Sequence, residues 1–187
     1  MDLKKNMTVQ DFDIVSFRYK TSLMKPKHRV AIIMGSLTDY KILKKAEVLL
    51  KELKVPFITE VVSAHRSPEF MFEFASTAHE KNISVIIAGA GGAAHLPGMV
   101  ASLTHLPVIG VPIQVGSLKG LDALLSIAQM PKGIPVACMA VDNAENAALM
   151  AARMIGIADE KIRNKVIQGL KKNKAKVKLM NKTLKKA

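Results

Sequence analysis

Polar residues follow the first apolar run of the chain, where Gly35-Ser36-Leu37-Thr38-Asp39 comes directly after Val30–Met34. Ser36 and Thr38 precede a helix-length stretch, whose free N–H groups and dipole favour an anion. The alternative is that one hydroxyl only caps that helix. Asp39 would repel a phosphate but can accept hydrogen bonds from sugar hydroxyls, unless it is simply a first-turn acid favoured by the dipole. Together these residues indicate a site for a phosphorylated sugar.

A second polar segment, Ser63-Ala64-His65-Arg66, follows the next apolar run. Histidine is the side chain that exchanges a proton near neutral pH, and arginine carries a permanent charge suited to phosphate. His65 is therefore a candidate for proton transfer beside a phosphate-binding Arg66. The alternative is a histidine that only caps or packs.

The third run leads into Gly89-Ala90-Gly91-Gly92-Ala93-Ala94-His95, in which small residues let a ligand approach the backbone closely. A dinucleotide site is not indicated, because Ala94 stands where the third glycine belongs and no acidic residue occurs about 20 positions on. His95 is either a second polar contact or the cap of the following helix.

Two other kinds of site lack support in the sequence. The five histidines show no H-x-x-x-H or H-x-H spacing, and the single cysteine, Cys138, lies in an apolar run where we expect it to be buried. There is also no G-x-S-x-G sequence for an acyl-transfer serine.

The elements that must position these residues alternate between short apolar runs and amphipathic stretches. Strands are predicted at Val30–Met34, Phe57–Val62, Val85–Ala88, Val108–Val111 and Val136–Ala140, and helices at Asp39–Leu53, Pro68–Lys81, Pro97–Leu103, Leu118–Gln129 and Ala144–Ile155. Continuous apolar strands separated by helices predict a doubly wound parallel sheet in a single three-layer α/β/α domain. In such a sheet the ligand lies at the carboxyl ends of the strands, where the polar segments are.

We expect three parts along the chain: an N-terminal arm (1–28), an α/β domain (29–158) and a basic C-terminal extension (159–187). The net charge is +13, yet residues 161–187 alone hold 11 Lys and Arg and no acid. We expect a solvated or partly helical appendage rather than a nucleic-acid contact, because only 4% of all residues are aromatic. The apolar residues of the extension are predicted to lack a helical stripe and to bury little surface; they are Leu170, Val177, Leu179, Met180 and Leu184.

Location is indicated by three further features. One cysteine fits a reducing cytoplasm, and the first residues, MDLKKNMTVQDFDIV, lack the apolar core of a signal peptide. The longest apolar runs are far shorter than the roughly 18 residues of a membrane span. The sequence therefore predicts a cytoplasmic protein.

Five ordered motifs resemble one known family. VAIIMGSLTD, VVSAHRSP, IAGAGGAAHLPGM, VIGVPIQ and GLDALLSIAQMPKGIPV, within residues 30–136, are similar to the bacterial N5-carboxyaminoimidazole ribonucleotide mutases of purine synthesis. The resemblance extends over about residues 29–156. Val115 and Lys119 stand at loop positions that are often serine in that family.

The resemblance implies a flavodoxin-like fold, a homo-octamer, and neither a metal nor an organic cofactor. It implies that Ser36 and Arg66 bind the 5′-phosphate with Thr38 nearby, and that Asp39 holds the ribose hydroxyls. His65 would be the general acid and base, and His95 would lie close to the transferring carboxylate. The base and carboxylate pocket would be shaped by Ser63, Ala64, Ala90, Gly91 and Leu96.

Two other functions remain open from the sequence. One is a carboxylase of the same fold that uses CO2 and aminoimidazole ribonucleotide directly. The other is a nucleotide-responsive binding module whose basic extension contacts nucleic acid. A separate synthetase that makes N5-carboxyaminoimidazole ribonucleotide is a possible pathway partner of the mutase.

Overall fold

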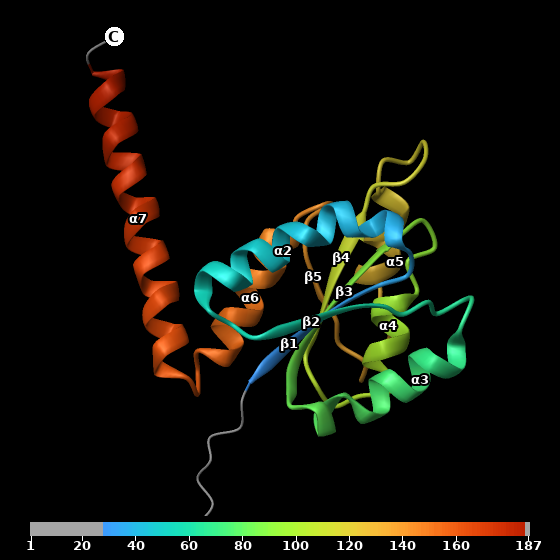
Figure 1. Cartoon of the computed structure of the whole chain (residues 1–187). Coiled ribbons are helices and arrows are strands. Elements are labelled where there is room, and N and C mark those ends of the chain that lie inside the picture. Colours follow the sequence, from blue (N-terminus) through green and yellow to red (C-terminus); the bar gives the residue numbers. More distant parts are fainter. Residues whose placement is uncertain (1–27, 186–187) are drawn as a thin grey trace, which may run out of the picture.

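The computed structural model describes residues 28–185, which form an α/β body and one projecting helix (Figure 1). The predicted arm of residues 1–28 lies outside the described residues except for His28. The strands are β1 (Arg29–Met34), β2 (Phe57–Val61), β3 (Ile83–Gly91), β4 (Val108–Ile113) and β5 (Ala137–Cys138). The α-helices are α2 (Tyr40–Leu53), α3 (Pro68–Thr77), α4 (Leu96–Ala101), α5 (Leu121–Ala128), α6 (Ala144–Ile155) and α7 (Glu160–Leu184), and two short 3-10 helices are η1 (Leu37–Asp39) and η2 (Ala78–Lys81).

All strand pairs are parallel, and the sheet order is β2-β1-β3-β4-β5. One face is covered by α2, α6 and the start of α7, and the other by α3, α4 and α5 (Figure 1). The predicted three-layer, doubly wound fold is therefore confirmed. The chain adds β2 on one side of β1 and then β3, β4 and β5 on the other side. The switch point of the sheet therefore lies beside β1.

The strands read as apolar runs because both faces of the sheet are covered. In β1, Val30, Ile32 and Met34 pack into the core on one face, while Ala31 and Ile33 pack into the core on the other. Side chains of successive strand residues point to opposite faces, so neither face tolerates a polar residue here.

Three predicted boundaries are wrong by several residues. β3 and β4 continue past Ala88 and Val111, because the ladder pairs Gly91 with Ile113. Residues 89–91 are therefore strand rather than loop. The helix predicted from Leu118 begins only at Leu121, after Gly120 in a left-handed conformation with φ 88°.

Smaller differences concern β5, α3 and Cys138. The strand predicted over Val136–Ala140 consists of only two residues, and Cys138 in it is half-buried rather than buried. Ser67 stands at the N-cap of α3, but its side chain makes no capping hydrogen bond.

The basic extension forms one continuous helix, α7. Its first turns are anchored, because Ile162 and Val166 are buried in the core formed with α2 and α6. The rest projects beyond the body (Figure 1) and is exposed, so the expectation that it buries little apolar surface is confirmed within the described chain. No helix among residues 28–185 has the length and apolar character needed to cross a membrane.

Candidate active site

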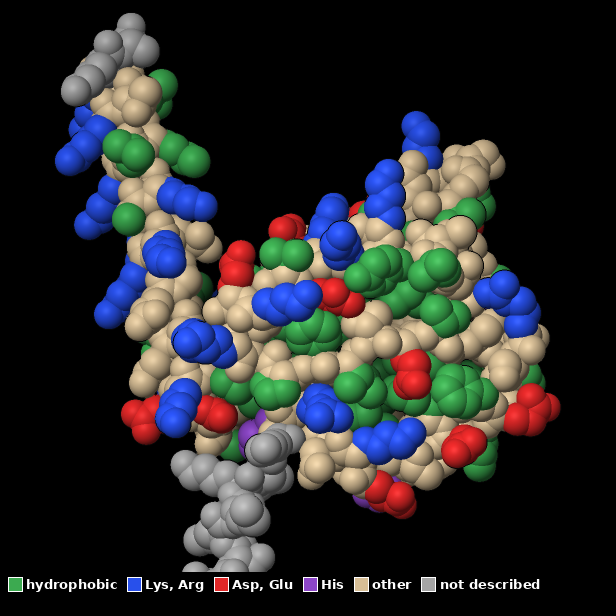
Figure 2. Space-filling view, viewed as in Figure 1, with side chains coloured by type: hydrophobic (Ala, Val, Ile, Leu, Met, Phe, Trp, Pro, Cys, Tyr) green, Lys and Arg blue, Asp and Glu red, His purple; other side chains and the backbone are tan. Residues whose placement is uncertain are grey.

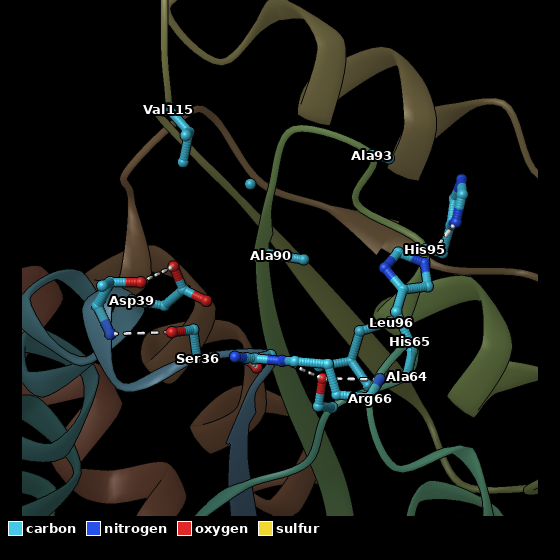
Figure 3. A pocket seen from close by; sticks show the side chains of 14 residues that line it. Ser36, Asp39, Ala64, His65, Arg66, Ala90, Ala93, His95, Leu96 and Val115 are labelled. Atoms are coloured by element: carbon cyan, nitrogen blue, oxygen red, sulfur yellow. Dashed lines mark hydrogen bonds between the residues drawn. The ribbon is translucent and has the colours of Figure 1, made fainter.

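A cavity of about 370 Å³ opens at the carboxyl ends of β1, β2 and β3, at the switch point of the sheet (Figure 3). Three segments supply most of its wall: the turn after β1, the loop after β2, and the end of β3 with the start of α4. Its lining residues are Gly35, Ser36, Thr38, Asp39, Ser63, Ala64, His65, Arg66, Ala90, Gly91, Ala93, His95, Leu96 and Val115.

The wall after β1 is a turn of η1 that leads directly into α2. The Oγ of Ser36 accepts a hydrogen bond from the backbone N–H of Thr38 at 3.4 Å, so this hydroxyl does cap the short helix. The hydroxyl of Thr38 donates to a carboxylate oxygen of Asp39 at 3.4 Å. Both hydroxyls still line the cavity, where they meet the amino end of α2.

Asp39 is a buried carboxyl at the edge of this cavity, with 8% of its surface exposed. Burial removes water from the carboxylate and raises the pKa of Asp39 above its ordinary value. Hydrogen bonds from the Ser36 backbone and the Thr38 hydroxyl, and the charge of Arg66, oppose that rise. Asp39 is therefore a carboxyl whose ionised form is penalised by burial and favoured by its neighbours.

Arg66 is held in place by the loop after β2. Its Nε donates to the Oγ of Ser63 at 3.2 Å, and one terminal nitrogen donates to the carbonyl oxygen of Gly35. The backbone N–H of Arg66 also donates to Ser63 Oγ at 3.3 Å. The guanidinium reaches across the floor of the cavity toward Ser36 (Figure 3), which places its charge beside the α2 amino end.

The two histidines of the cavity meet on the side away from Asp39 (Figure 3). Nε2 of His65 lies 2.8 Å from Nδ1 of His95, within hydrogen-bonding distance. Their rings stand almost perpendicular, at 84°, with centroids 4.9 Å apart. One of these nitrogens donates and the other accepts, and the tautomers of the two rings decide which. His95 stands at the N-cap of α4 but makes no side-chain capping bond there.

Small and apolar side chains form the remaining wall. Ala64, Ala90 and Leu96 are buried, and Gly91 lies beside them at the end of β3. Val115, in the loop after β4, stands over Gly91 and is half exposed. These uncharged side chains determine the shape of the cavity and add no charge to it.

The structure brings all of the sequence-predicted site residues to this one cavity. Sequence reasoning missed three lining residues: Gly35, Ala93 and Val115. Gly35 and Ala93 lie inside the polar segments already singled out, so proximity in sequence was an available signal. Val115 comes from the loop after β4, and only the pairing of β3 with β4 brings it here.

A bound molecule would thus meet three different environments. Arg66 and the α2 amino end suit a phosphate, Asp39 suits hydroxyl groups, and the histidine pair lies against the small-residue wall. Among residues 28–185, no three His, Cys, Asp or Glu side chains are grouped so that they could hold a metal ion. The arrangement suits proton transfer to and from a phosphorylated ligand.

Comparison with known proteins identifies the family. The sequence profile of the AIR carboxylase family matches residues 29–176, which include the whole cavity. The chain belongs to the AIR carboxylase family.

Curated AIR carboxylase relatives cover most of the chain. A Pyrococcus horikoshii protein is 55% identical over 156 residues, which is 83% of this chain and 88% of that protein. An Aquifex aeolicus protein is 60% identical over 134 residues, or 72% of this chain and 79% of that one. Both are named N5-carboxyaminoimidazole ribonucleotide mutase.

The fold is also shared with a solved structure. The crystal structure of Treponema denticola PurE superposes with a TM-score of 0.77 at 27% sequence identity. The match covers 84% of this chain and 98% of the Treponema chain.

Proposed function

We propose that this AIR carboxylase family member is an N5-carboxyaminoimidazole ribonucleotide mutase acting in purine biosynthesis. The enzyme moves a carboxylate from the exocyclic nitrogen of the substrate to ring carbon 4. The observation that carries the assignment is the single cavity in which the His65–His95 pair faces Arg66 and Asp39. Its support from outside the chain is the name shared by relatives that are 55–60% identical.

Binding uses the polar side of the cavity. Arg66 and the Ser36 hydroxyl hold the 5′-phosphate at the amino end of α2, with Thr38 nearby. The buried carboxylate of Asp39 accepts hydrogen bonds from the ribose hydroxyls. These contacts fix the nucleotide so that its base and carboxylate point to the opposite side, where the histidines lie.

Transfer proceeds through a trapped CO2. As the bond between the exocyclic nitrogen and the carboxylate carbon breaks, CO2 forms and the nitrogen takes a proton from His65. Ring carbon 4 then attacks CO2, a carbon–carbon bond forms, and His65 takes the proton that carbon 4 loses. One proton is given and one is recovered, so the reaction is an isomerisation that needs no other reactant.

The small-residue wall retains the intermediate. Ser63, Ala64, Ala90, Gly91 and Leu96 line the part of the cavity that receives the base and the carboxylate, and none of these side chains is charged. Exclusion of water keeps CO2 from escaping or being hydrated between the two steps. His95 keeps the ring of His65 oriented toward the transferring group.

A turnover assay tests the proposal. Purified protein is incubated without ATP, either with N5-carboxyaminoimidazole ribonucleotide or with aminoimidazole ribonucleotide and CO2 at low bicarbonate. Appearance of 4-carboxy-5-aminoimidazole ribonucleotide absorbance from the first substrate is expected. Faster turnover of the second substrate would identify a direct carboxylase instead, and turnover of neither would leave only a binding module.

We further infer a cytoplasmic homo-octamer that works without a metal or organic cofactor, with residues 29–158 as its catalytic unit. The single half-buried cysteine supports a reducing compartment. The step that precedes this one is the ATP-dependent carboxylation of the amino group, so a synthetase for N5-carboxyaminoimidazole ribonucleotide is its pathway partner. Light scattering of the purified chain tests the octamer directly.

A further inference from the structure

One side of helix α7 carries a row of lysines. Its members recur at intervals of three or four residues, the spacing that places side chains on the same face of a helix. All of them are exposed, and they are Lys171, Lys174, Lys178, Lys182 and, at the C-cap, Lys185. Because a helix rises about 1.5 Å per residue, this lysine row is about 21 Å long.

The lysine row is separate from the apolar face of the same helix. Ile162 and Val166 pack into the core with α6, and Leu170 and Val177 continue their face along the projecting part. Successive helix residues are about 100° apart around the axis, so the centre of the row lies about a third of a turn from that face. The row therefore stays on another side of α7, whatever the apolar face contacts.

No acidic side chain of the described chain neutralises the lysine row. The sequence contains no Asp or Glu after Glu160, and within residues 28–185 no carboxylate lies at ion-pair distance from a lysine of the row. Figure 2 shows basic side chains along the projecting part of α7. Lysines four residues apart repel each other and destabilise a helix, and a negatively charged partner relieves that repulsion.

The excess positive charge is concentrated on this one helix. Residues 30–160 hold 10 Lys and Arg against 12 Asp and Glu, whereas residues 161–187 hold 11 Lys and Arg and no acid. The α/β body is thus nearly neutral, and the charge lies on a helix that projects from it (Figure 1). A straight row of point charges matches a partner that is itself extended and regularly charged.

The residue types of α7 favour the phosphate backbone of a nucleic acid duplex as that partner. Lysine binds phosphate as a point charge, and α7 has no arginine beyond Arg163 for the forked contacts that read base edges. The helix contains no aromatic residue, so it offers no platform on which the bases of a single strand could stack. A low aromatic content therefore counts against single strands and not against contact with a duplex backbone.

We propose that the lysine row of α7 binds the phosphate backbone of double-stranded nucleic acid without sequence preference. Each lysine replaces counterions condensed on the phosphates, and the release of those counterions drives binding. Five such contacts predict that the logarithm of the association constant falls with the logarithm of the salt concentration with a slope of about −4.5. The lysine row lies outside the cavity, so this inference does not rest on the mutase chemistry.

Fluorescence anisotropy tests the contact with the full-length protein. A labelled DNA duplex of mixed sequence, about 20 base pairs long, is titrated between about 50 and 200 mM salt. Changing Lys174, Lys178 and Lys182 together to Gln is expected to weaken binding at least about tenfold at the lower salt and to reduce the slope by about 2.7. Glutamine is as good a helix former as lysine and removes the repulsion between like charges, so this variant keeps α7 intact.

A matched control removes the same charge from the other side of α7. Lys161, Lys172 and Lys176 are exposed and lie away from the lysine row, and all three are changed to Gln. Binding should then weaken by less than about threefold, with a slope reduced by less than about 1. If both triple variants weakened binding equally, the attraction would follow net charge alone and the assignment to the row would be overturned.

Further probes identify the source of the phosphate. DNA and RNA duplexes share the backbone chemistry, so both are expected to bind, and the single strand of the same length should bind more weakly. Tighter binding of the single strand overturns the proposal, as does binding of inorganic polyphosphate without binding of a duplex. Absence of duplex binding, or binding that does not depend on salt, overturns it too. Turnover of the row variant should equal that of the wild type, so a failure of the proposed mutase activity is seen separately.

Discussion

Replacement of His65 by asparagine tests the proton-transfer step directly. Asparagine keeps a polar side chain at the cavity wall but cannot exchange a proton near neutral pH. A general acid–base group contributes about 10²–10⁴-fold, which corresponds to about 2.7–5.4 kcal/mol of barrier. Because His65 is exposed in the cavity, the stability cost should stay within about 0.5 kcal/mol.

The partner of His65 should matter less, by an amount set by one hydrogen bond. His95→Leu removes the contact that now spans 2.8 Å. A net loss of about 0.5–1.5 kcal/mol gives about a two- to tenfold decrease in rate. His95→Asn places an amide where Nδ1 was, so it should restore most of that loss.

The assay is kcat for conversion of N5-carboxyaminoimidazole ribonucleotide, with nucleotide binding measured separately by calorimetry. Binding should change little in the His65 variant. If His65→Asn retained more than about a tenth of the wild-type rate, this residue would not carry the proton. If His95→Leu were as damaging as His65→Asn, His95 would itself be a proton carrier and not a positioning residue.

Three further predictions concern the other walls of the cavity. Arg66→Lys keeps the charge but loses the forked contacts to Ser63 and Gly35, so KM should rise about tenfold or more while kcat changes little; an unchanged KM would refute the phosphate assignment. Asp39→Asn should raise the unfolding temperature at pH 7, because burial raises the pKa of this acid and so penalises its ionised form. The gain should vanish as the pH falls below 3.8, where the acid is protonated in both the folded and the unfolded chain. A gain that grew in acid would show that the folded protein does not raise this pKa. Gly91→Ala should lower the free energy of unfolding by about 1–3 kcal/mol in urea titrations, because the new Cβ would lie 2.4 Å from Val115. Adding Val115→Ala should recover only part of the lost stability, since the backbone oxygen of Ile113 stays 2.9 Å from that Cβ.

The position of the site was predictable because the rule behind it is topological. Parallel strands covered on both faces read as continuous apolar runs, and their carboxyl ends share one edge of the sheet. His65 and Asp39 are 26 residues apart in sequence, yet both follow such runs. Convergence at the switch point then follows without any knowledge of side-chain contacts.

The pairing of the two histidines could not be predicted from the same rule. His95 stands at the start of α4, where a capping role is the commoner interpretation, and the choice depends on side-chain direction. The direction is set by tertiary contacts: His65 in the loop after β2 offers a ring nitrogen at 2.8 Å, and the helix end offers nothing better. The local sequence does not show whether His95 caps α4 or contacts His65.

The continuity of α7 could not be predicted for a different reason. Leu170, Val177 and Leu184 repeat every seven residues and share one helix face, so the expectation that they lack a helical stripe is wrong. That spacing is visible only when the segment is taken as one uninterrupted helix, and Gly169 with a high lysine content argues against that. The packing of Ile162 and Val166 against α6 fixes the first turns of α7 and so provides a nucleus for the helix. Once the first turns are fixed, each further residue adds a helical hydrogen bond without a new nucleation cost.

The glycine-rich segment after Ala88 shows how one sequence pattern can have several physical causes. A Cβ on Gly89 would lie 2.7 Å from Leu43 in α2, so this glycine is required by packing beneath the cavity and not by a ligand. Gly92 is required by its backbone, since its φ is 62°. Only Gly91 borders the cavity itself, where its missing side chain makes room for Val115. The segment therefore brings α2, β4 and the cavity wall close together, and that tight packing gives the cavity a wall of small residues.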